Sequence, residues 1–216
     1  MRSLPDLIRL AGEREMDLHE AILAADSEAT GVPSEQIFEL ISSRLKDMRR
    51  SAEEASCSNN PCRMVPKTGP LLRGYSKKGG MCGGFILKAS AIALEVATYN
   101  ASMGRIVAAP TAGSCGILPG MLFAWEEFYG KDAADKERKL TEALVVAGAV
   151  GEIIANRATL AGAEGGCQAE CGAAAAMGSA ALVYLQGGTC EAVSNAVALT
   201  LKSVLGLVCD PVGGLV

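Results

Sequence analysis

Apolar residues recur at helical spacing in the first part of the chain. Within residues 34–55 the apolar positions that share one helix face are Ile37, Leu40, Ile41, Leu45 and Met48. Ser34 follows Pro33 directly and is a residue type that caps helix N-termini. Two shorter amphipathic helices are predicted ahead of it, over residues 4–11 and 17–26.

The second half of the chain holds apolar stretches that are rich in small residues. Residues 85–99 are apolar nearly all round, which is typical of a helix buried on several sides. Three further helices are predicted over 141–158, 170–186 and 190–207, where Ala, Gly, Val and Leu predominate. Small side chains allow close backbone approach, so the pattern predicts a compact all-α helical bundle. The only strand candidate is the short stretch 105–109.

Residues 56–84 interrupt this helical pattern. Asparagine, proline and repeated glycines, with Gly-Gly pairs at 79–80 and 83–84, are the residue types of turns and loops. We therefore predict one helical domain spanning residues 1–216, with a glycine-rich loop region at 56–84 inside it.

Composition and charge narrow the class of protein. The chain has 216 residues, half of them hydrophobic, and a formal charge of −4, which fits a globular domain with a sizeable core. Without a basic cluster, nucleic-acid binding is not expected. The most apolar windows, 141–163 and 189–208, include charged residues such as Glu152 and Lys202, so they are interpreted as buried helices and not as membrane spans. The N-terminus lacks the apolar run of a signal peptide, which predicts the cytoplasm.

The cysteines and the single histidine limit the possible chemistry. In a reducing compartment, eight cysteines favour free thiols or metal ligands over disulfides. Cys57 and Cys62 form one pair without a second pair at matching spacing, which favours surface thiols over a metal or redox site. His19 lies among acidic residues and is interpreted as a solvated surface residue. Sites built on several histidines are excluded, so ligands must be thiolates, carboxylates or backbone groups.

The densest chemistry lies in residues 161–172, Ala-Gly-Ala-Glu-Gly-Gly-Cys-Gln-Ala-Glu-Cys-Gly. A glycine pair permits close backbone approach, and Cys167 follows where an Ala-rich helix is predicted to start. The positive end of a helix dipole lowers a thiol pKa, and thiolate is the form that binds soft metals and iron–sulfur clusters. Cys209, immediately before Asp210-Pro211, repeats the arrangement at a chain turn.

A second informative loop is residues 109–120, Ala-Pro-Thr-Ala-Gly-Ser-Cys-Gly-Ile-Leu-Pro-Gly, and a helix is predicted to begin near Ile117. The hydroxyls of Thr111 and Ser114 and the backbone N–H groups of the loop would point to one place, which suits a carboxylate. An ordinary capped turn is an equally good interpretation of these residues.

These two segments, together with Gly-Leu-Val-Cys-Asp-Pro-Val-Gly-Gly-Leu-Val at 206–216, resemble the α chain of iron–sulfur-dependent L-serine dehydratases. The likeness runs through residues 85–216 and more loosely through the N-terminal helices. It implies an all-helical chain that carries a [4Fe–4S] cluster, a β chain that completes the active site, and conversion of L-serine into pyruvate and ammonia. By motif, Cys167 and Cys209 match cluster ligands. A third cysteine is expected beyond Val216, so we expect this sequence to be an incomplete α chain that is inactive alone.

The resemblance also implies roles for individual residues. An iron with an open position would act as a Lewis acid on the substrate hydroxyl and carboxylate. Glu164 and Glu170 flank the cluster cysteine, and each is a candidate general base or orienting group. The alternative for both is a carboxylate that the helix dipole stabilises. Candidates for holding substrate are Thr111, Gly113, Ser114 and, more weakly, Lys67.

Two alternatives stay open at this point. Cys115 and Cys171 lie beside the motifs where the family pattern accepts Ala or Val, so packed core thiols are favoured and an alternative ligand pair is the second interpretation. The competing function is a non-catalytic, cysteine-rich helical module that binds a metal or a partner. We also expect an oligomer.

Overall fold

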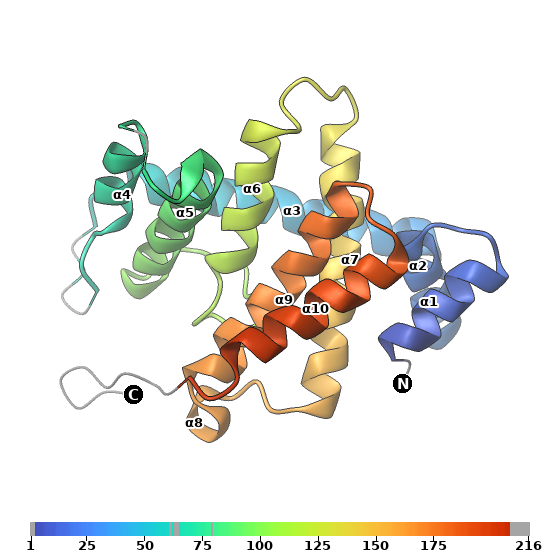
Figure 1. Cartoon of the computed structure of the whole chain (residues 1–216). Coiled ribbons are helices and arrows are strands. Elements are labelled where there is room, and N and C mark those ends of the chain that lie inside the picture. The colour runs from blue at the N-terminus through green and yellow to red at the C-terminus, as the bar shows by residue number, and fades with distance from the viewer. Residues whose placement is uncertain (1–2, 61, 63–64, 79, 208–216) are drawn as a thin grey trace. The chain divides into compact units, whose positions relative to one another are not determined.

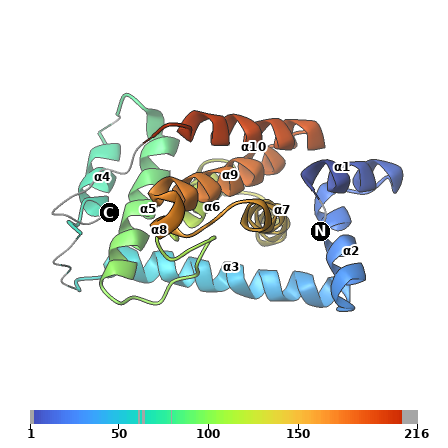
Figure 2. The ribbon, with the colours of Figure 1, turned by 90° about the horizontal axis from the view of Figure 1, so that it is seen from below.

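The computed structural model describes residues 3–60, 62, 65–78 and 80–207, and within these residues every regular element is a helix (Figure 1, and Figure 2 from below). This confirms the predicted all-α fold. The strand candidate at 105–109 is wrong, because that stretch has no regular secondary structure. The helices are α1 (Leu4–Glu13), α2 (Leu18–Thr30), α3 (Ser34–Cys57), α4 (Gly69–Ser76), α5 (Gly83–Ala101), α6 (Ile117–Phe128), α7 (Lys136–Arg157), α8 (Gly162–Gly165), α9 (Cys167–Leu185) and α10 (Cys190–Val204).

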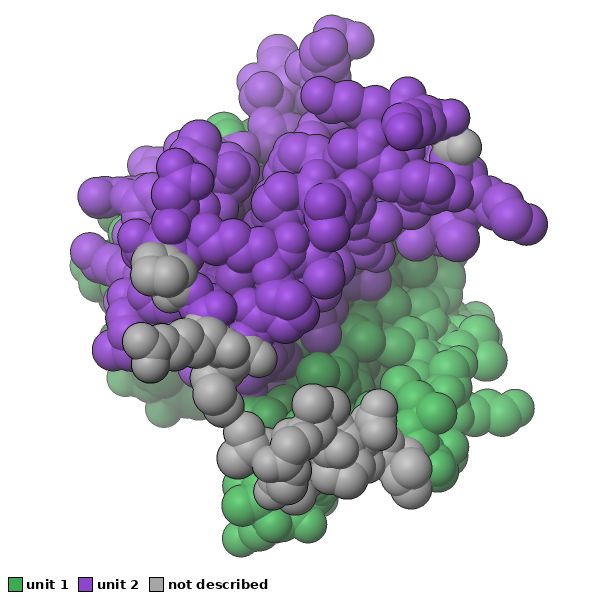
Figure 3. Space-filling model, turned by 90° about the vertical axis from the view of Figure 1, so that its left-hand side faces the viewer, with its two compact units in different colours: residues 1–43, 137–216 green, residues 44–136 purple. Residues whose placement is uncertain are grey.

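The chain divides into two compact units (Figure 3). Unit 1 consists of residues 1–43 and 137–216, and unit 2 consists of residues 44–136. The boundaries fall within α3 and at the start of α7. One domain spanning residues 1–216 stays a prediction.

In unit 1, small residues bring the helices close together. α9 and α10 lie side by side in both ribbon views (Figures 1 and 2). A Cβ on Gly172 of α9 would lie 3.1 Å from the Val204 side chain of α10. A Cβ on Gly151 of α7 would lie 2.8 Å from the sulfur of Met177 on α9. Most alanines of α9 are buried. The space between α9 and its neighbouring helices therefore has room for small side chains only.

His19 lies in the core of unit 1, so its interpretation as a solvated surface residue is wrong. Its side chain on α2 is only 6% exposed, and Nδ1 lies 2.7 Å from the Tyr184 hydroxyl on α9. Nε2 lies 3.8 Å from a carboxylate oxygen of Glu142 on α7. A buried ring nitrogen needs a partner, and here the partners come from distant parts of the chain. The acidic neighbours in the sequence therefore did not indicate its environment.

Unit 2 is built on a close contact between α5 and α6. A Cβ on Gly116 would lie 2.1 Å from the Ala93 carbonyl oxygen, and one on Gly120 would lie 2.6 Å from the Ala89 carbonyl oxygen. Both opposing atoms are backbone, so only glycine allows α6 to lie this close to α5. The contact holds the start of α6, and with it the loop that precedes this helix.

An ion pair that the sequence pattern did not predict joins α4 to α5 in unit 2. Arg73 Nε donates to Glu95 at 2.8 Å, and a second guanidinium nitrogen bonds the other carboxylate oxygen. Glu95 is only 4% exposed, and the hydrogen bond to this carboxylate raises the pKa of Arg73. Such a bidentate pair satisfies a buried carboxylate that would otherwise be costly.

Several predicted boundaries differ from the structure. α4 lies inside the stretch 56–84 that was predicted to be loop. α7 begins at Lys136, because its charged first turns are supported by pairs such as Arg138–Glu142, spaced four residues apart. Ser34 is the first residue of α3 and not its cap, and its hydroxyl donates to the Leu23 carbonyl at 3.3 Å.

None of the helices in the described part of the chain combines the length and the apolar character that crossing a lipid bilayer requires.

Candidate active site

The predicted site residues fall into two groups, one in each unit. Unit 2 holds the substrate-binding candidates, which are Thr111, Gly113, Ser114 and Lys67. Unit 1 holds the residues next to the proposed cluster, which are Glu164, Cys167 and Glu170. Cys209 lies outside the described residues.

The loop ahead of α6 brings the Thr111 and Ser114 hydroxyls to 3.2 Å from each other. Ser114 is 2% exposed, and its hydroxyl donates to the Ala109 carbonyl at 3.3 Å. α6 begins at Ile117, as predicted. Because Ser114 gives its only proton to the Ala109 carbonyl, the Thr111 hydroxyl donates to Ser114. This leaves Thr111 Oγ1, which is half-buried, with unused acceptor capacity.

One residue outside the predicted set holds this loop in place. The amide of Asn100, at the end of α5, donates to the Ala112 carbonyl at 3.0 Å. The sequence pattern contained no signal for it, because an asparagine near a helix end more often serves its own helix. Together with the close contact at Gly116, this hydrogen bond attaches the loop to α5.

Cys115 lies in the core next to the two hydroxyl residues. It is 1% exposed, and desolvation raises the pKa of its thiol to about 11. A thiol with such a pKa stays protonated at neutral pH, whereas a metal ligand must be a thiolate. The structure therefore favours the packed core thiol over the ligand at this position.

Lys67, a predicted substrate-binding residue, contacts the backbone of the segment that follows α3. Its exposed ammonium donates to the Ser58 carbonyl at 3.2 Å. The small cavity that it lines, of about 20 Å³, is also bordered by the end of α3, by Ser58, Asn60 and Pro70, and by residues of α5. No residue of the loop ahead of α6 is among the residues that line this cavity. A role for Lys67 in holding substrate stays a prediction.

Cys167 is the first residue of α9, at the point where the chain changes direction after α8. Gly166 has φ +72°, a conformation that glycine adopts without the cost a side chain would add. The side chain of Cys167 is half-buried at the positive end of a helix of 19 residues. The helix start at Cys167 agrees with the prediction, and the thiolate expected there stays a prediction. Cys171 lies one turn further along the same helix, also half-buried.

The two acidic candidates have different surroundings. Glu164 is exposed and accepts a hydrogen bond of 2.7 Å from the Thr159 hydroxyl. Glu170 is half-buried in the first turn of α9, and its carboxylate lies against Gly162 of α8. A Cβ on Gly162 would be 3.0 Å from a Glu170 oxygen, so the glycine leaves room for this carboxylate.

No group of three or more His, Cys, Asp or Glu side chains arranged to hold a metal ion occurs in the part of the chain that the structure describes. At Cys167 the chemistry fits an iron–sulfur cluster, because a partly accessible thiolate at a helix N-terminus is a suitable ligand.

The sequence of this chain is similar to those of one known protein family. Residues 13–216 match the family described as "Serine dehydratase alpha chain". The L-serine dehydratase α chain of Peptoniphilus asaccharolyticus is 38% identical over 214 residues, which cover 98% of this chain and 72% of that protein. The probable L-serine dehydratase α chain of Bacillus subtilis is 38% identical over 222 residues, covering 100% of this chain and 71% of that protein.

A longer relative matches a smaller part of the sequence. The L-serine dehydratase of Mycobacterium bovis is 44% identical over 125 residues, which cover 58% of this chain and 27% of that protein. Because the family match extends over nearly the whole sequence and two α chains align with almost all of it, the chain belongs to the serine dehydratase α chain family.

Proposed function

We propose that this chain is the α chain of an L-serine dehydratase, a lyase that converts L-serine into pyruvate and ammonia. The observation that carries the proposal is the family match over residues 13–216, which includes both informative loops. In this reaction the α-proton and the β-hydroxyl leave as water and a Cα–Cβ double bond forms. The resulting enamine tautomerises to an imine, and water then releases ammonia and leaves pyruvate.

In this proposal Cys167 and Cys209 hold a [4Fe–4S] cluster. When bound, the cluster supplies an iron with an open position that acts as a Lewis acid toward the substrate hydroxyl and carboxylate. The position of Cys167 at the start of α9 supports the proposal, because the positive end of a helix dipole favours the thiolate that a cluster ligand must be. The assignment of Cys209 rests on its Cys-Asp-Pro-Val motif alone.

The loop ahead of α6 would hold the substrate in this reaction. Thr111 donates its proton to Ser114, so its oxygen is free to accept a hydrogen bond from the substrate ammonium. Ser114 is buried and bonded to the Ala109 carbonyl, so its role is to shape the loop and orient Thr111. Gly113 is exposed and has no side chain, so the substrate can approach the backbone there.

Proton removal from Cα is assigned to Glu170. Glu164 is exposed and bonded to the Thr159 hydroxyl, whereas Glu170 is half-buried in the first turn of the cysteine helix. Because the Glu170 carboxylate is less open to solvent and lies on the same helix as Cys167, we assign the proton transfer to it. Glu164 would then hold the connection between α7 and α8 in position through Thr159.

A β chain is the proposed partner, as the α chain designation of the two full-length relatives suggests. In this proposal the chain binds L-serine and the β chain. A cytoplasmic location and an oligomeric state stay predictions.

The test uses the full-length α chain mixed with its β chain, iron and sulfide under anaerobic conditions. Cys167→Ser is expected to abolish both the visible absorbance of the cluster and the formation of pyruvate from L-serine, because a hydroxyl is a poor cluster ligand. Cys57→Ser is the matched control, since Cys57 is an exposed thiol at the end of α3. Loss of both signals in the Cys57 variant, with the Cys167 variant intact, would contradict the ligand assignment.

A further inference from the structure

A polar pocket in unit 2 is lined by none of the residues assigned to the proposed reaction. Its volume is about 180 Å³, and it is lined by one face of α3 and by residues 105–107. α3 contributes side chains spaced three or four residues apart, which share one helix face. The pocket residues that matter for the argument are Arg44, Asp47, Arg50, Ser51, Glu54 and Arg105.

The two carboxylates of the pocket already accept hydrogen bonds from neighbouring side chains of the protein. Asp47 accepts a hydrogen bond of 3.2 Å from Arg44. Glu54 accepts one of 2.8 Å from Arg50 and another of 2.8 Å from the Tyr99 hydroxyl. The hydrogen bonds from Arg50 and then Tyr99 lower the pKa of Glu54, and each of the two carboxylates already has a partner.

A third guanidinium gives the pocket an excess of positive charge. Arg105 is exposed, and its guanidinium has no hydrogen bond or ion pair among the residues that the structure describes. Three guanidinium groups therefore face two carboxylates that are themselves satisfied. The fork of N–H donors on arginine binds carboxylate and phosphate oxygens in a bidentate way.

The hydroxyl of Ser51 provides a second, independent indication that the pocket binds a ligand. It lines the pocket and is only 3% exposed, yet its Oγ has no hydrogen-bond partner within the described part of the chain. A buried hydroxyl without a partner is destabilising, and native proteins rarely leave one in that state. A ligand oxygen in the pocket would supply the missing acceptor.

We propose that this pocket is a binding site for a small ligand that carries an anionic group, either a carboxylate or a phosphate. Arg105 binds the anionic group, and Ser51 donates a hydrogen bond to it. The pocket has room for such a group, because a water molecule in the liquid occupies about 30 Å³ and the pocket measures about 180 Å³.

The site is connected to the substrate loop through the backbone. Residues 105–107 continue directly into the loop that begins at Ala109, so a ligand on Arg105 restrains the chain just ahead of Thr111. Under the proposed function the ligand therefore changes the KM for L-serine. This consequence rests on the proposed function, whereas binding in the pocket does not depend on it.

The test is an NMR titration of the ¹⁵N-labelled chain with inorganic phosphate in one arm and acetate in the other, at constant ionic strength. Saturable shifts are expected for amides in residues 44–54 and 105–107. Arg105→Gln is expected to weaken binding about tenfold or more, because it removes a charge-assisted pair. Ser51→Ala is expected to weaken it about threefold without lowering stability, since the hydroxyl has no partner to lose.

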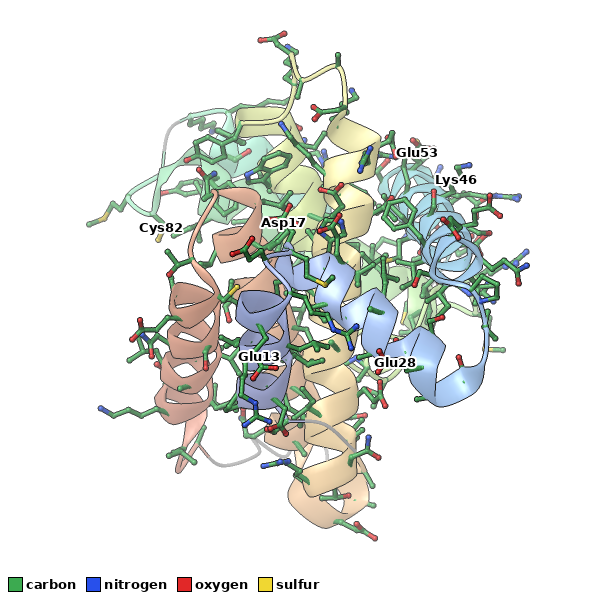
Figure 4. All side chains as sticks on the ribbon, turned by 90° about the vertical axis from the view of Figure 1, so that its right-hand side faces the viewer. Glu13, Asp17, Glu28, Lys46, Glu53 and Cys82 are labelled. Atoms are coloured by element: carbon green, nitrogen blue, oxygen red, sulfur yellow. The ribbon has the colours of Figure 1, made fainter. Side chains whose placement is uncertain are left out.

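Lys46→Gln is the matched control, because it removes the same charge from an exposed position on α3, the helix that lines the pocket, but not from the pocket itself (Figure 4). Its affinity for the ligand should stay within about twofold of the unchanged protein. Shifts with phosphate alone or with acetate alone identify which anion the site takes. The proposal is overturned if neither anion gives saturable shifts, or if Lys46→Gln and Arg105→Gln weaken binding equally.

Discussion

At the scale of single residues, the surroundings of each cysteine show whether it suits the role of cluster ligand, core thiol or surface thiol. The number of cysteines alone does not show this. Cys167 begins a helix and is half-buried, whereas Cys115 lies in the core of unit 2 and keeps its proton. Cys57 is exposed at the end of α3, in agreement with the surface thiol predicted for it. Position relative to a helix end and to solvent decides which sulfur can act as a ligand.

The buried thiol of Cys115 predicts a loss of stability at high pH. Folding raises its pKa from 9.0 to about 11, so above pH 9 the unfolded chain loses this proton first and is favoured. The free energy of unfolding should fall by about 2–3 kcal/mol between pH 9 and pH 11. Urea unfolding at a series of pH values measures this. In Cys115→Ala the decrease should be smaller by that amount, and an unchanged decrease would contradict the prediction.

The hydroxyl of Thr111 predicts an effect on substrate affinity. Thr111→Val keeps the shape of the side chain and removes the acceptor proposed for the substrate ammonium. We expect the KM for L-serine to rise about tenfold, which is the effect of losing a hydrogen bond to a charged group. Steady-state kinetics with pyruvate detection measures it. Thr111→Ser retains the hydroxyl and should keep the KM within about twofold, so a large rise in this variant as well would rule out the proposed role.

At the scale of elements, two glycines on α6 decide how closely this helix approaches α5. Gly116 faces the Ala93 carbonyl and Gly120 faces the Ala89 carbonyl, so in each case the opposing group is backbone that cannot rotate away. The loop that carries Thr111 and Ser114 is attached to α6 at Gly116. The geometry of the candidate substrate site therefore depends on the packing of one helix pair.

Gly116→Ala tests this dependence. The added methyl group would lie 2.1 Å from the Ala93 carbonyl oxygen, so α6 must move away from α5. We expect the free energy of unfolding to fall by about 1–3 kcal/mol, measured by urea denaturation. Gly148→Ala is the contrasting variant, because Gly148 is exposed within α7 and a Cβ there meets nothing within 4 Å. It should stabilise the chain by about 1 kcal/mol, and equal destabilisation by both variants would exclude helix contact as the cause.

At the scale of the whole molecule, contacts between distant parts of the sequence hold each unit together. In unit 1, His19 of α2 bonds Tyr184 of α9, although 165 residues separate them. Burial raises the pKa of Tyr184, so its hydroxyl keeps its proton and is able to donate it to His19 Nδ1. In unit 2, Arg73 and Glu95 join α4 to α5 in a similar way.

His19→Phe tests the contact in unit 1. It keeps an aromatic ring of similar size but leaves the Tyr184 hydroxyl without its acceptor, so we expect a loss of about 1–3 kcal/mol in the free energy of unfolding. The measurement is a double-mutant cycle with Tyr184→Phe, which removes the hydroxyl as well. The double variant should be more stable than the sum of the single effects predicts. Strict additivity would mean that the hydrogen bond contributes nothing.

Much of the candidate site follows from the sequence because its features are local. The helix start at Cys167, the helix start at Ile117 and the closeness of two hydroxyls three residues apart depend on neighbouring residues. The hydrogen bond from Asn100 and the contact of the Glu170 carboxylate with Gly162 depend on how separate elements pack. The residues adjacent in the sequence do not contain that information.

The sequence by itself determined the all-α class, the positions of the main helices and the three motifs that indicate the family. Helical periodicity and the residue types at helix ends are local properties, so they are present in the order of the residues. Only the tertiary structure decided that His19 is buried and that Arg105 and Ser51 line one pocket. These outcomes depend on which distant side chains meet when hydrophobic surfaces pack, and this depends on the whole fold.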